Sequence, residues 1–374
     1  MLKKTFLPLL LALSMVAGGW VLLSRLARAN EVSRHYFPFF ADGLLPPPLP
    51  PPVPLTSTLP LDAPTLAVEL AAQGQELGLN KIGFHVGIPG NLTGLEAWMA
   101  ALDDAGIPFF LKSVDYADPL VAAQTLAQTS GISHTLVFRK TGVSYDLPNY
   151  NLPPVEAAQQ HWLHHKLAFP AALDPSLVWV ETVNEVDKNR AEWLAEFALE
   201  TAQLALTDGF RWAAFGWSSG EPEPEHWELP AMIDFLQLAA AHPDRIAIAL
   251  HEYSYETNDI ANIYPYLVGR FQALFQVCDR HGIPRPTILI TEWGWKYQDV
   301  PLVAEAMEDI AWAAWLYAAY PQVRGAAIWY LGYGYGGIAD QAQQLIAPLT
   351  EYSLHHYFSL TPGQGSVDPF LFAP

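Results

Sequence analysis

The chain has 374 residues and a formal net charge of −19, from 38 acidic and 19 basic side chains. A surface this acidic repels polyanions, so nucleic acid and uronate-rich polymers are poor partners and neutral ones are expected. Aromatic residues make up 13% of the chain, and its single cysteine, Cys278, rules out an internal disulfide framework.

The N-terminus has the pattern of an export signal. Lys3 and Lys4 precede an uncharged apolar run over residues 5–24, and Ala27 and Ala29 are spaced as an A-x-A cleavage site. The run is almost long enough to span a bilayer, so a membrane tether through residues 5–24 is the alternative to cleavage. In both cases residues 1–29 predict an extracellular or cell-surface location for the rest of the chain.

A proline-rich segment follows the leader. The stretch "LLPPPLPPPVPLTSTLPLDAP" ends at Pro64, and proline at this density favours an extended polyproline II spacer that does not pack as part of a core. We therefore predict a linker over residues 30–64, with a propeptide remnant as the alternative, and one folded domain over residues 65–374.

Short apolar runs alternate with helix-period segments throughout that domain. Such an alternation predicts a parallel sheet that is covered by helices on its outer face. Eight units of this kind predict a (β/α)8 TIM barrel of the usual size. A doubly wound sheet is the rival, but "FHVGIPGN" after the first run is a poor match to a Gly-rich phosphate loop. The runs begin at Lys81, Pro108, His134, Leu177, Arg211, Ile246, Thr287 and Gly325.

Polar and aromatic side chains occur where these predicted strands end. The C-terminal ends of barrel strands form the active-site mouth, so these side chains should converge there. In chain order they are His85, Lys112, Asp115, Arg139, Asn184, Glu185, Trp217, His251, Tyr253, Glu292 and Trp329.

Two glutamates, Glu185 and Glu292, end the fourth and seventh predicted strands. Two carboxyls that face each other across a barrel mouth suit retaining glycoside hydrolysis, in which one donates a proton and the other attacks the anomeric carbon. Their mutual repulsion is expected to help keep the proton donor protonated near neutral pH.

The motifs "NE" at Asn184-Glu185 and "TEWG" around Glu292 resemble those of clan A glycoside hydrolases, in particular families 5, 39 and 128. The resemblance covers about residues 81–358. It implies an O-glycosyl hydrolase with Glu185 as acid/base and Glu292 as nucleophile. The resemblance further implies that Asn184 holds a sugar 2-hydroxyl and that Trp329 stacks on a sugar ring. It also implies that His251 and Tyr253 form an H-x-Y motif, whose tyrosine hydrogen-bonds the nucleophile.

One position departs from the clan pattern, because Lys112 stands where many members have an arginine beside the nucleophile. Lys112 or Arg139 could serve instead, but lysine lacks the bidentate fork of arginine. The departure leaves open a second hypothesis, a catalytically inactive barrel that binds glycan or a cell-surface partner.

Further aromatic residues are assigned to substrate binding. Trp217 and Trp295 are predicted to bind sugar, as are Tyr330, Tyr333 and Tyr335 in a glycine-rich loop, with packing in the core or loop as the alternative. The sequence predicts a neutral poly- or oligosaccharide as substrate and no cofactor. The run "HWLHH" at residues 161–165 lacks an H-E-x-x-H pattern, so no metal site is predicted. The oligomeric state stays open.

Overall fold

A computed structural model describes residues 47–88, 90–335 and 337–372. The predicted signal or anchor over residues 1–29 and the tether through residues 5–24 lie outside the described residues. Within the described part of the chain, no helix is both long and apolar enough to cross a membrane.

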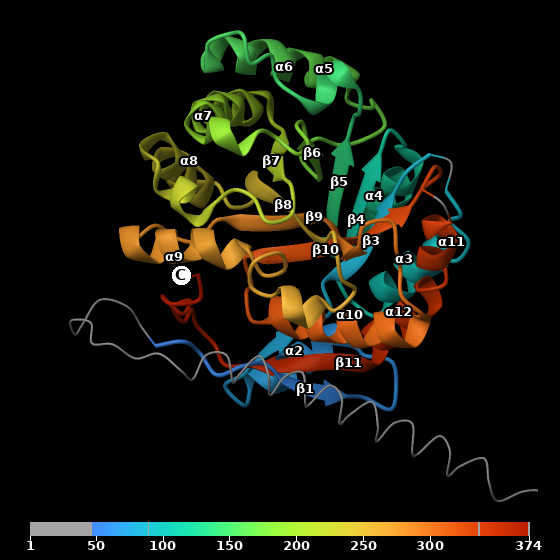
Figure 1. The fold of residues 1–374 in the computed structure, drawn as a ribbon. Helices are drawn as coiled ribbons and strands as arrows, with labels where there is room; N and C mark the ends of the chain where they lie inside the picture. The colour runs from blue at the N-terminus through green and yellow to red at the C-terminus, as the bar shows by residue number, and fades with distance from the viewer. Residues whose placement is uncertain (1–46, 89, 336, 373–374) are drawn as a thin grey trace, which may run out of the picture.

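The architecture is a closed barrel of eight strands in the order β10-β3-β4-β5-β6-β7-β8-β9, all parallel (Figure 1). The predicted TIM barrel is therefore confirmed, and each predicted run contributes one strand. The strands are β3 (Ile82–Val86), β4 (Phe110–Val114), β5 (Thr135–Arg139), β6 (Val178–Glu181), β7 (Arg211–Trp217), β8 (Ile246–Ser254), β9 (Thr287–Lys296) and β10 (Val323–Leu331).

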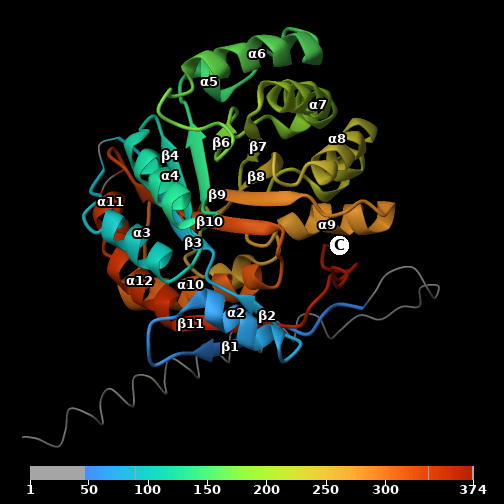
Figure 2. The same cartoon turned by 180° about the vertical axis from the view of Figure 1, so that it is seen from behind.

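Helices cover the outer face of the barrel, as Figures 1 and 2 show from opposite sides. Several end where the sequence places glycine; α7, for example, ends before Gly209, whose φ of 83° favours a residue without a Cβ. The helices are α3 (Leu95–Asp104), α4 (Asp118–Ser130), α5 (Val143–Asp146), α6 (Pro154–Ala168), α7 (Ala191–Asp208), α8 (Pro230–Ala241), α9 (Phe271–His281), α10 (Val303–Ala318), α11 (Ile338–Gln343) and α12 (Ile346–His355), with 3-10 turns η1 (Lys188–Arg190), η2 (Pro224–Glu228) and η3 (Ile260–Ile263).

The barrel interior has an apolar floor with a polar layer above it. Two large rings, Phe110 and Trp179, fill the floor together with small side chains such as Ala213 and Ala327. Because side chains alternate along a strand, residues two positions beyond the floor also point inward, one layer closer to the mouth. We call these five buried side chains the polar layer: Lys112, Arg139, Glu181, His251 and Thr291.

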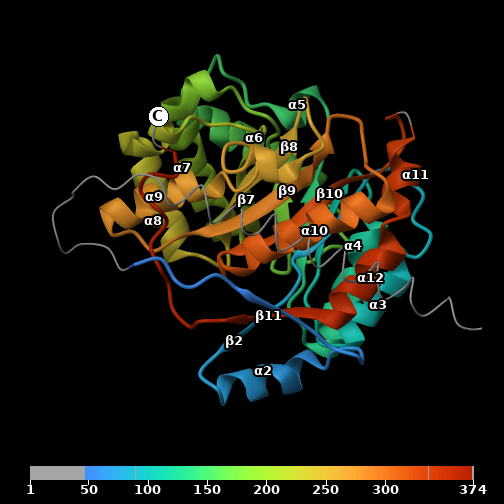
Figure 3. The ribbon, with the colours of Figure 1, turned by 60° about the horizontal axis from the view of Figure 1, so that its bottom comes forward.

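A small sheet lies at the opposite end of the barrel from the mouth. It consists of β1 (Val53–Thr56), β11 (His356–Leu360) and β2 (Glu76–Gly78), and α2 (Ala63–Ala71) packs beside it (Figure 3). The N–H of Ala63 donates to the carbonyl of Ala105, just before β4 begins, which places this layer where the barrel strands start.

This layer corrects the predicted linker boundary. Strand β1 lies inside residues 30–64 and pairs antiparallel with β11, Leu61 is buried, and the carbonyl of Pro52 accepts a hydrogen bond from Trp315 Nε1. Proline is tolerated here because β1 is an edge strand, where a missing N–H costs little. Residues 53–64 therefore belong to the folded domain.

Candidate active site

A cavity of about 530 Å³ opens where the barrel strands end. Eleven of the residues predicted for the mouth or for sugar binding line it, so the barrel brings together positions that are far apart in the sequence. They are His85, Asp115, Arg139, Asn184, Glu185, Tyr253, Glu292, Trp295, Trp329, Tyr330 and Tyr335. His251, which is only 2% exposed, lies in the polar layer beneath them.

Glu185 follows β6 in a tightly held loop. Its φ of 48° is unusual for a residue with a side chain and costs on the order of 1–3 kcal/mol, and its backbone N–H donates to the carbonyl of Gly216 at 2.7 Å. Position 216 requires glycine, because a Cβ there would lie 2.7 Å from the carbonyl oxygen of Val183 and φ is 50°. The loop thus aims Glu185 from β6 toward the barrel axis.

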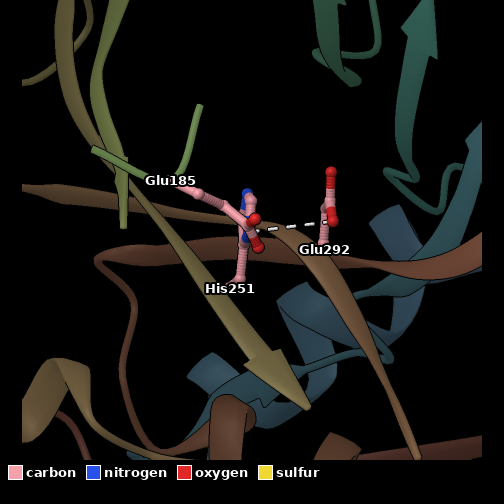
Figure 4. A group of neighbouring side chains, drawn as sticks. All are labelled: Glu185, His251 and Glu292. Atoms are coloured by element: carbon pink, nitrogen blue, oxygen red, sulfur yellow. Dashed lines mark ion pairs between the residues drawn. The ribbon is translucent and has the colours of Figure 1, made fainter. Parts of the chain in front are cut away.

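Glu185, His251 and Glu292 converge from the β6 loop, β8 and β9 (Figure 4). One carboxylate oxygen of Glu185 and one of Glu292 lie within 4.8 Å of each other. His251 lies between them, with Nδ1 3.5 Å from Glu185 Oε1 and 3.7 Å from Glu292 Oε2. A separation of about 5 Å is the one that retaining glycosidases use.

Two cations contact Glu292. Arg139 Nη1 donates to Glu292 Oε1 at 3.1 Å, and Lys112 Nζ lies 3.4 Å from the same oxygen. Burial by itself would raise the pKa of Glu292, but the neighbouring His251, Lys112, His85 and Arg139 outweigh it and hold that pKa far below its usual range. Glu292 is therefore an ionised carboxylate. Arg139, on the third strand, provides the arginine that the second strand lacks.

Glu185 is surrounded by hydrogen-bond donors. Tyr253 donates its hydroxyl to Glu185 Oε1 at 2.7 Å, and Ser218 Oγ does so at 3.3 Å. The neighbouring His251 is the largest influence on the pKa of Glu185, and together with the Tyr253 hydroxyl it lowers that pKa despite burial and the repulsion from Glu292, which both raise it. The expectation that repulsion from Glu292 helps keep Glu185 protonated near neutral pH is therefore wrong, because the effects of His251 and Tyr253 outweigh that repulsion.

The partner of Tyr253 is a second correction. The clan resemblance implied a hydrogen bond from this tyrosine to Glu292, whereas its hydroxyl contacts Glu185. Asn184, the neighbour of Glu185, uses Oδ1 to accept a hydrogen bond from Arg139 Nη1. Arg139 thus ties the loop after β6 to Glu292, and Asn184 lines the cavity next to Glu185.

Aromatic rings form a wall of the cavity beside Glu292. Trp329 is partly exposed and lies nearly parallel to Tyr330 and Tyr297, with ring centroids 4.9 Å and 6.2 Å away. Tyr335 meets Trp329 edge-on at 4.6 Å. On the other side, Tyr255 is 52% exposed and its hydroxyl lies 3.1 Å from Ser218 Oγ, close to Glu185.

Two predicted binding tryptophans are packed side chains instead. Trp217 is fully buried against Phe215, outside the cavity, because the strand bulge at Gly216 turns its ring toward the helices. Trp295 borders the cavity but is 2% exposed, and its Nε1 donates to Asp309. It therefore supports the wall and offers no open face for stacking.

Two of the three histidines of the run "HWLHH", His161 and His165, are engaged by the backbone. His161 Nε2 lies 2.7 Å from the carbonyl oxygen of Thr182, and His165 Nε2 lies 3.1 Å from that of Tyr145. Among the described residues, Glu185, His251 and Glu292 could instead bring three ligand atoms to a metal ion. Lys112 and Arg139, which contact Glu292, would repel such a cation.

Several residues at or beneath the site, among them Glu181, Tyr255 and Tyr297, were not predicted from the sequence. Glu181, four positions before Glu185, is fully buried and lies 2.6 Å from Lys112 Nζ. Its alternation with Trp179, an inward-facing residue, is the signal that could have located it. Tyr255 and Tyr297 lie just beyond the ends of β8 and β9, where no regular spacing shows which way a loop side chain points.

Comparisons with known proteins do not assign the chain to a family. No family model matches the chain, and no curated protein matches it. Among the solved structures that are similar to this chain, XacCel5A has 11% identity and a TM-score of 0.40, with 74% of this chain and 98% of the other covered. A GH5-4 broad specificity endoglucanase from Bacteroides salanitronis has 14% identity and a TM-score of 0.36, with 86% and 99% covered, and the YdjI aldolase from Escherichia coli K12 has 10% identity and a TM-score of 0.34, with 79% and 96% covered.

One of these structures is named as a GH5-4 endoglucanase and another as an aldolase. A fold shared by enzymes of different chemistry does not identify a reaction. The function below therefore rests on the residues of the site.

Proposed function

We propose that this chain is a glycoside hydrolase that cleaves O-glycosidic bonds of a neutral glycan with retention of configuration. The observation that carries the proposal is the pair Glu185 and Glu292, whose carboxylate oxygens lie within 4.8 Å of each other in one cavity. That separation leaves room for an anomeric carbon but not for an additional attacking water, which favours double displacement over inversion.

The two glutamates would have different roles because their surroundings differ. Glu292 is 12% exposed, ionised, and held by Arg139, which suits a nucleophile that attacks the anomeric carbon. Glu185 is 42% exposed at the cavity surface. It would protonate the leaving oxygen as the C–O bond breaks, and then take a proton from the water that hydrolyses the ester on Glu292.

The surroundings of the pair support a neutral sugar as substrate. Sugar rings present apolar C–H faces, and Trp329, Tyr297 and Tyr335 offer aromatic faces beside Glu292. The chain carries a net charge of −19, which disfavours acidic polymers. Asn184 would hold a sugar hydroxyl next to the reacting carbon.

We also propose that the enzyme works outside the cytoplasm, either secreted or tethered at the cell surface through residues 5–24. This proposal rests on the sequence pattern of the leader. The layer of β1, β11 and β2 lies at the end of the barrel opposite the cavity, so a chain that enters at β1 leaves the mouth free to face a glycan.

A substrate screen tests the proposal. The chain from Asn30 onward is incubated with neutral polysaccharides and aryl glycosides, with Glu292→Ala as the matched control. NMR of the first-formed anomer should show retention of configuration. An inverted product would refute double displacement. Glycan binding by the wild-type protein without turnover would instead favour the inactive binding protein.

A further inference from the structure

Lys112 shares its ammonium group between two carboxylates inside the barrel. Nζ lies 2.6 Å from Glu181 Oε2 and 3.4 Å from Glu292 Oε1. Lys112 and Glu181 are both fully buried, and Glu181 Oε1 accepts a further hydrogen bond from Thr291 Oγ1 at 2.7 Å. Glu181 does not line the cavity, so any effect that it has on substrate must pass through another side chain.

Each cation beside Glu292 has a second carboxylate partner. Glu292 Oε1 receives both cations, Arg139 at 3.1 Å and Lys112 at 3.4 Å. Arg139 Nη2 also lies 3.6 Å from Asp146 Oδ1, whereas the second partner of Lys112 is Glu181. A buried ion that loses its partner is strongly destabilising, because neither water nor another group replaces the lost interaction.

We propose that Glu181 is a positioning residue that sets the reactivity of Glu292 through Lys112. The inference rests on the proposed glycosidase function. When Glu292 attacks the sugar, its carboxylate becomes a neutral ester and no longer balances two cations. Glu181 then remains as the partner of Lys112. Before attack, Glu181 draws part of the lysine charge away from Glu292, so that the carboxylate stays nucleophilic while positive charge develops on the sugar.

A second route from Glu181 to the site runs through His251, and it predicts a different result. His251 Nε2 lies 3.9 Å from Glu181 Oε1, and Nδ1 lies 3.5 Å from Glu185 Oε1. If Glu181 acted by this route, its loss would impair proton donation. Substrates with good leaving groups need little protonation, so they separate the two routes.

The experiment compares Glu181→Gln, Lys112→Met and the double variant, with Glu305→Gln, an exposed residue of α10, as a control for the loss of one negative charge. Each is assayed on the best polysaccharide from the screen and on an aryl glycoside with a good leaving group. Glu181→Gln should lower kcat roughly 10–100-fold, the usual effect of losing a group that orients a reactive one. KM should change little, and both substrates should be affected equally.

The double variant should be no slower than Lys112→Met, because the effects of residues that act as one unit are not additive.

Three results would overturn the proposal: an unchanged kcat in Glu181→Gln, a loss that the good leaving group relieves, or a double variant whose loss is the product of the single losses. If Glu181→Gln does not fold, the test is the comparison of kcat between Lys112→Met and the double variant. A lower kcat in the double variant would contradict action of Glu181 through Lys112. A wild-type protein that hydrolyses none of the glycans refutes the glycosidase function itself, which is a separate outcome.

Discussion

The hydroxyl of Tyr253 lies 2.7 Å from Glu185 Oε1, and the same oxygen lies 3.5 Å from His251 Nδ1. His251 beside the carboxyl and the Tyr253 hydroxyl that donates to it together hold the pKa of Glu185 below the ordinary glutamate value of 4.5. Catalysis needs Glu185 protonated before it can donate. This relationship therefore makes a prediction about pH.

We expect an acidic pH optimum, because activity should fall as pH rises through the lowered pKa of Glu185. In His251→Ala, both limbs of the pH profile of kcat/KM should move to higher pH. The reason is that His251 lowers the pKa of Glu185, which sets the alkaline limb, and of Glu292, which sets the acid limb. Tyr253→Phe should move only the alkaline limb. The pH dependence of kcat/KM for the three proteins is the measurement. A wild-type alkaline limb above neutral pH would contradict the assignment of Glu185 as the acid.

The two glutamates should differ in their dependence on the leaving group. Glu185→Ala should lose about 10²–10⁴-fold on natural glycans, and much less on aryl glycosides with good leaving groups. Glu292→Ala should lose activity on every substrate, because no covalent intermediate forms. Rates on a series of leaving groups measure the difference. Near-wild-type turnover of a natural glycan by either variant would end the assignment.

Trp329→Ala should lower kcat as well as weaken binding. The ring lies in the cavity wall beside Glu292, where its contacts would be best with the distorted sugar of the transition state. Tyr333→Ala is the matched control, because Tyr333 is 75% exposed and lies outside the cavity lining. If Trp329 were core, the variant would instead lose about 3–5 kcal/mol of stability. Melting and kinetics on one preparation separate the two.

Glu252 should make the protein less stable as pH rises from about 4.5 to about 7. Burial raises the pKa of this fully buried carboxyl to about 7. The folded state therefore holds a proton over that range while the unfolded chain releases it, which costs about 3 kcal/mol. Glu252→Gln should melt at a higher temperature than wild type at pH 8 and at a similar temperature at pH 4.

The glutamine side chain can still pair with the Tyr317 hydroxyl, which donates to Glu252 at 2.6 Å. Glu256→Gln, at an exposed position, controls for the loss of one surface charge. Identical dependence of the melting midpoint on pH in Glu252→Gln and wild type would show that Glu252 does not hold this proton.

Removal of residues 47–62 should destabilise the domain. The truncated chain lacks β1 and the buried Leu61, a side chain whose burial contributes about 1.5–3 kcal/mol. A chain that begins at Pro47 is the matched control. A thermal melt of both compares them directly, and equal midpoints would mean that β1 and Leu61 add nothing to stability.

Local pattern was enough to predict the eight barrel strands and the convergence of Glu185, Glu292 and His251. Strand and helix periodicities are written in neighbouring residues, and a closed parallel barrel brings its strand ends to one mouth whatever the loops contain. Tyr253 and Trp329 were located for the same reason. The hydrogen-bond partner of Tyr253 was not predicted, because strand register and bulges set the distance between side chains on different strands.

The remaining features depend on contacts between residues far apart in the sequence. Only closure of the barrel brings Arg139 and Lys112 to Glu292, and Glu181 to Lys112. A one-residue bulge at Gly216 buried Trp217, since each residue added to a strand reverses the face of the side chains that follow. Strand β1 formed inside a proline-rich segment because β11, some 300 residues later in the chain, offered an edge to pair with. The sequence alone thus determined which chemistry could meet at the mouth, while tertiary structure decided which charges touch, because Coulomb energies depend on distances of a few ångströms.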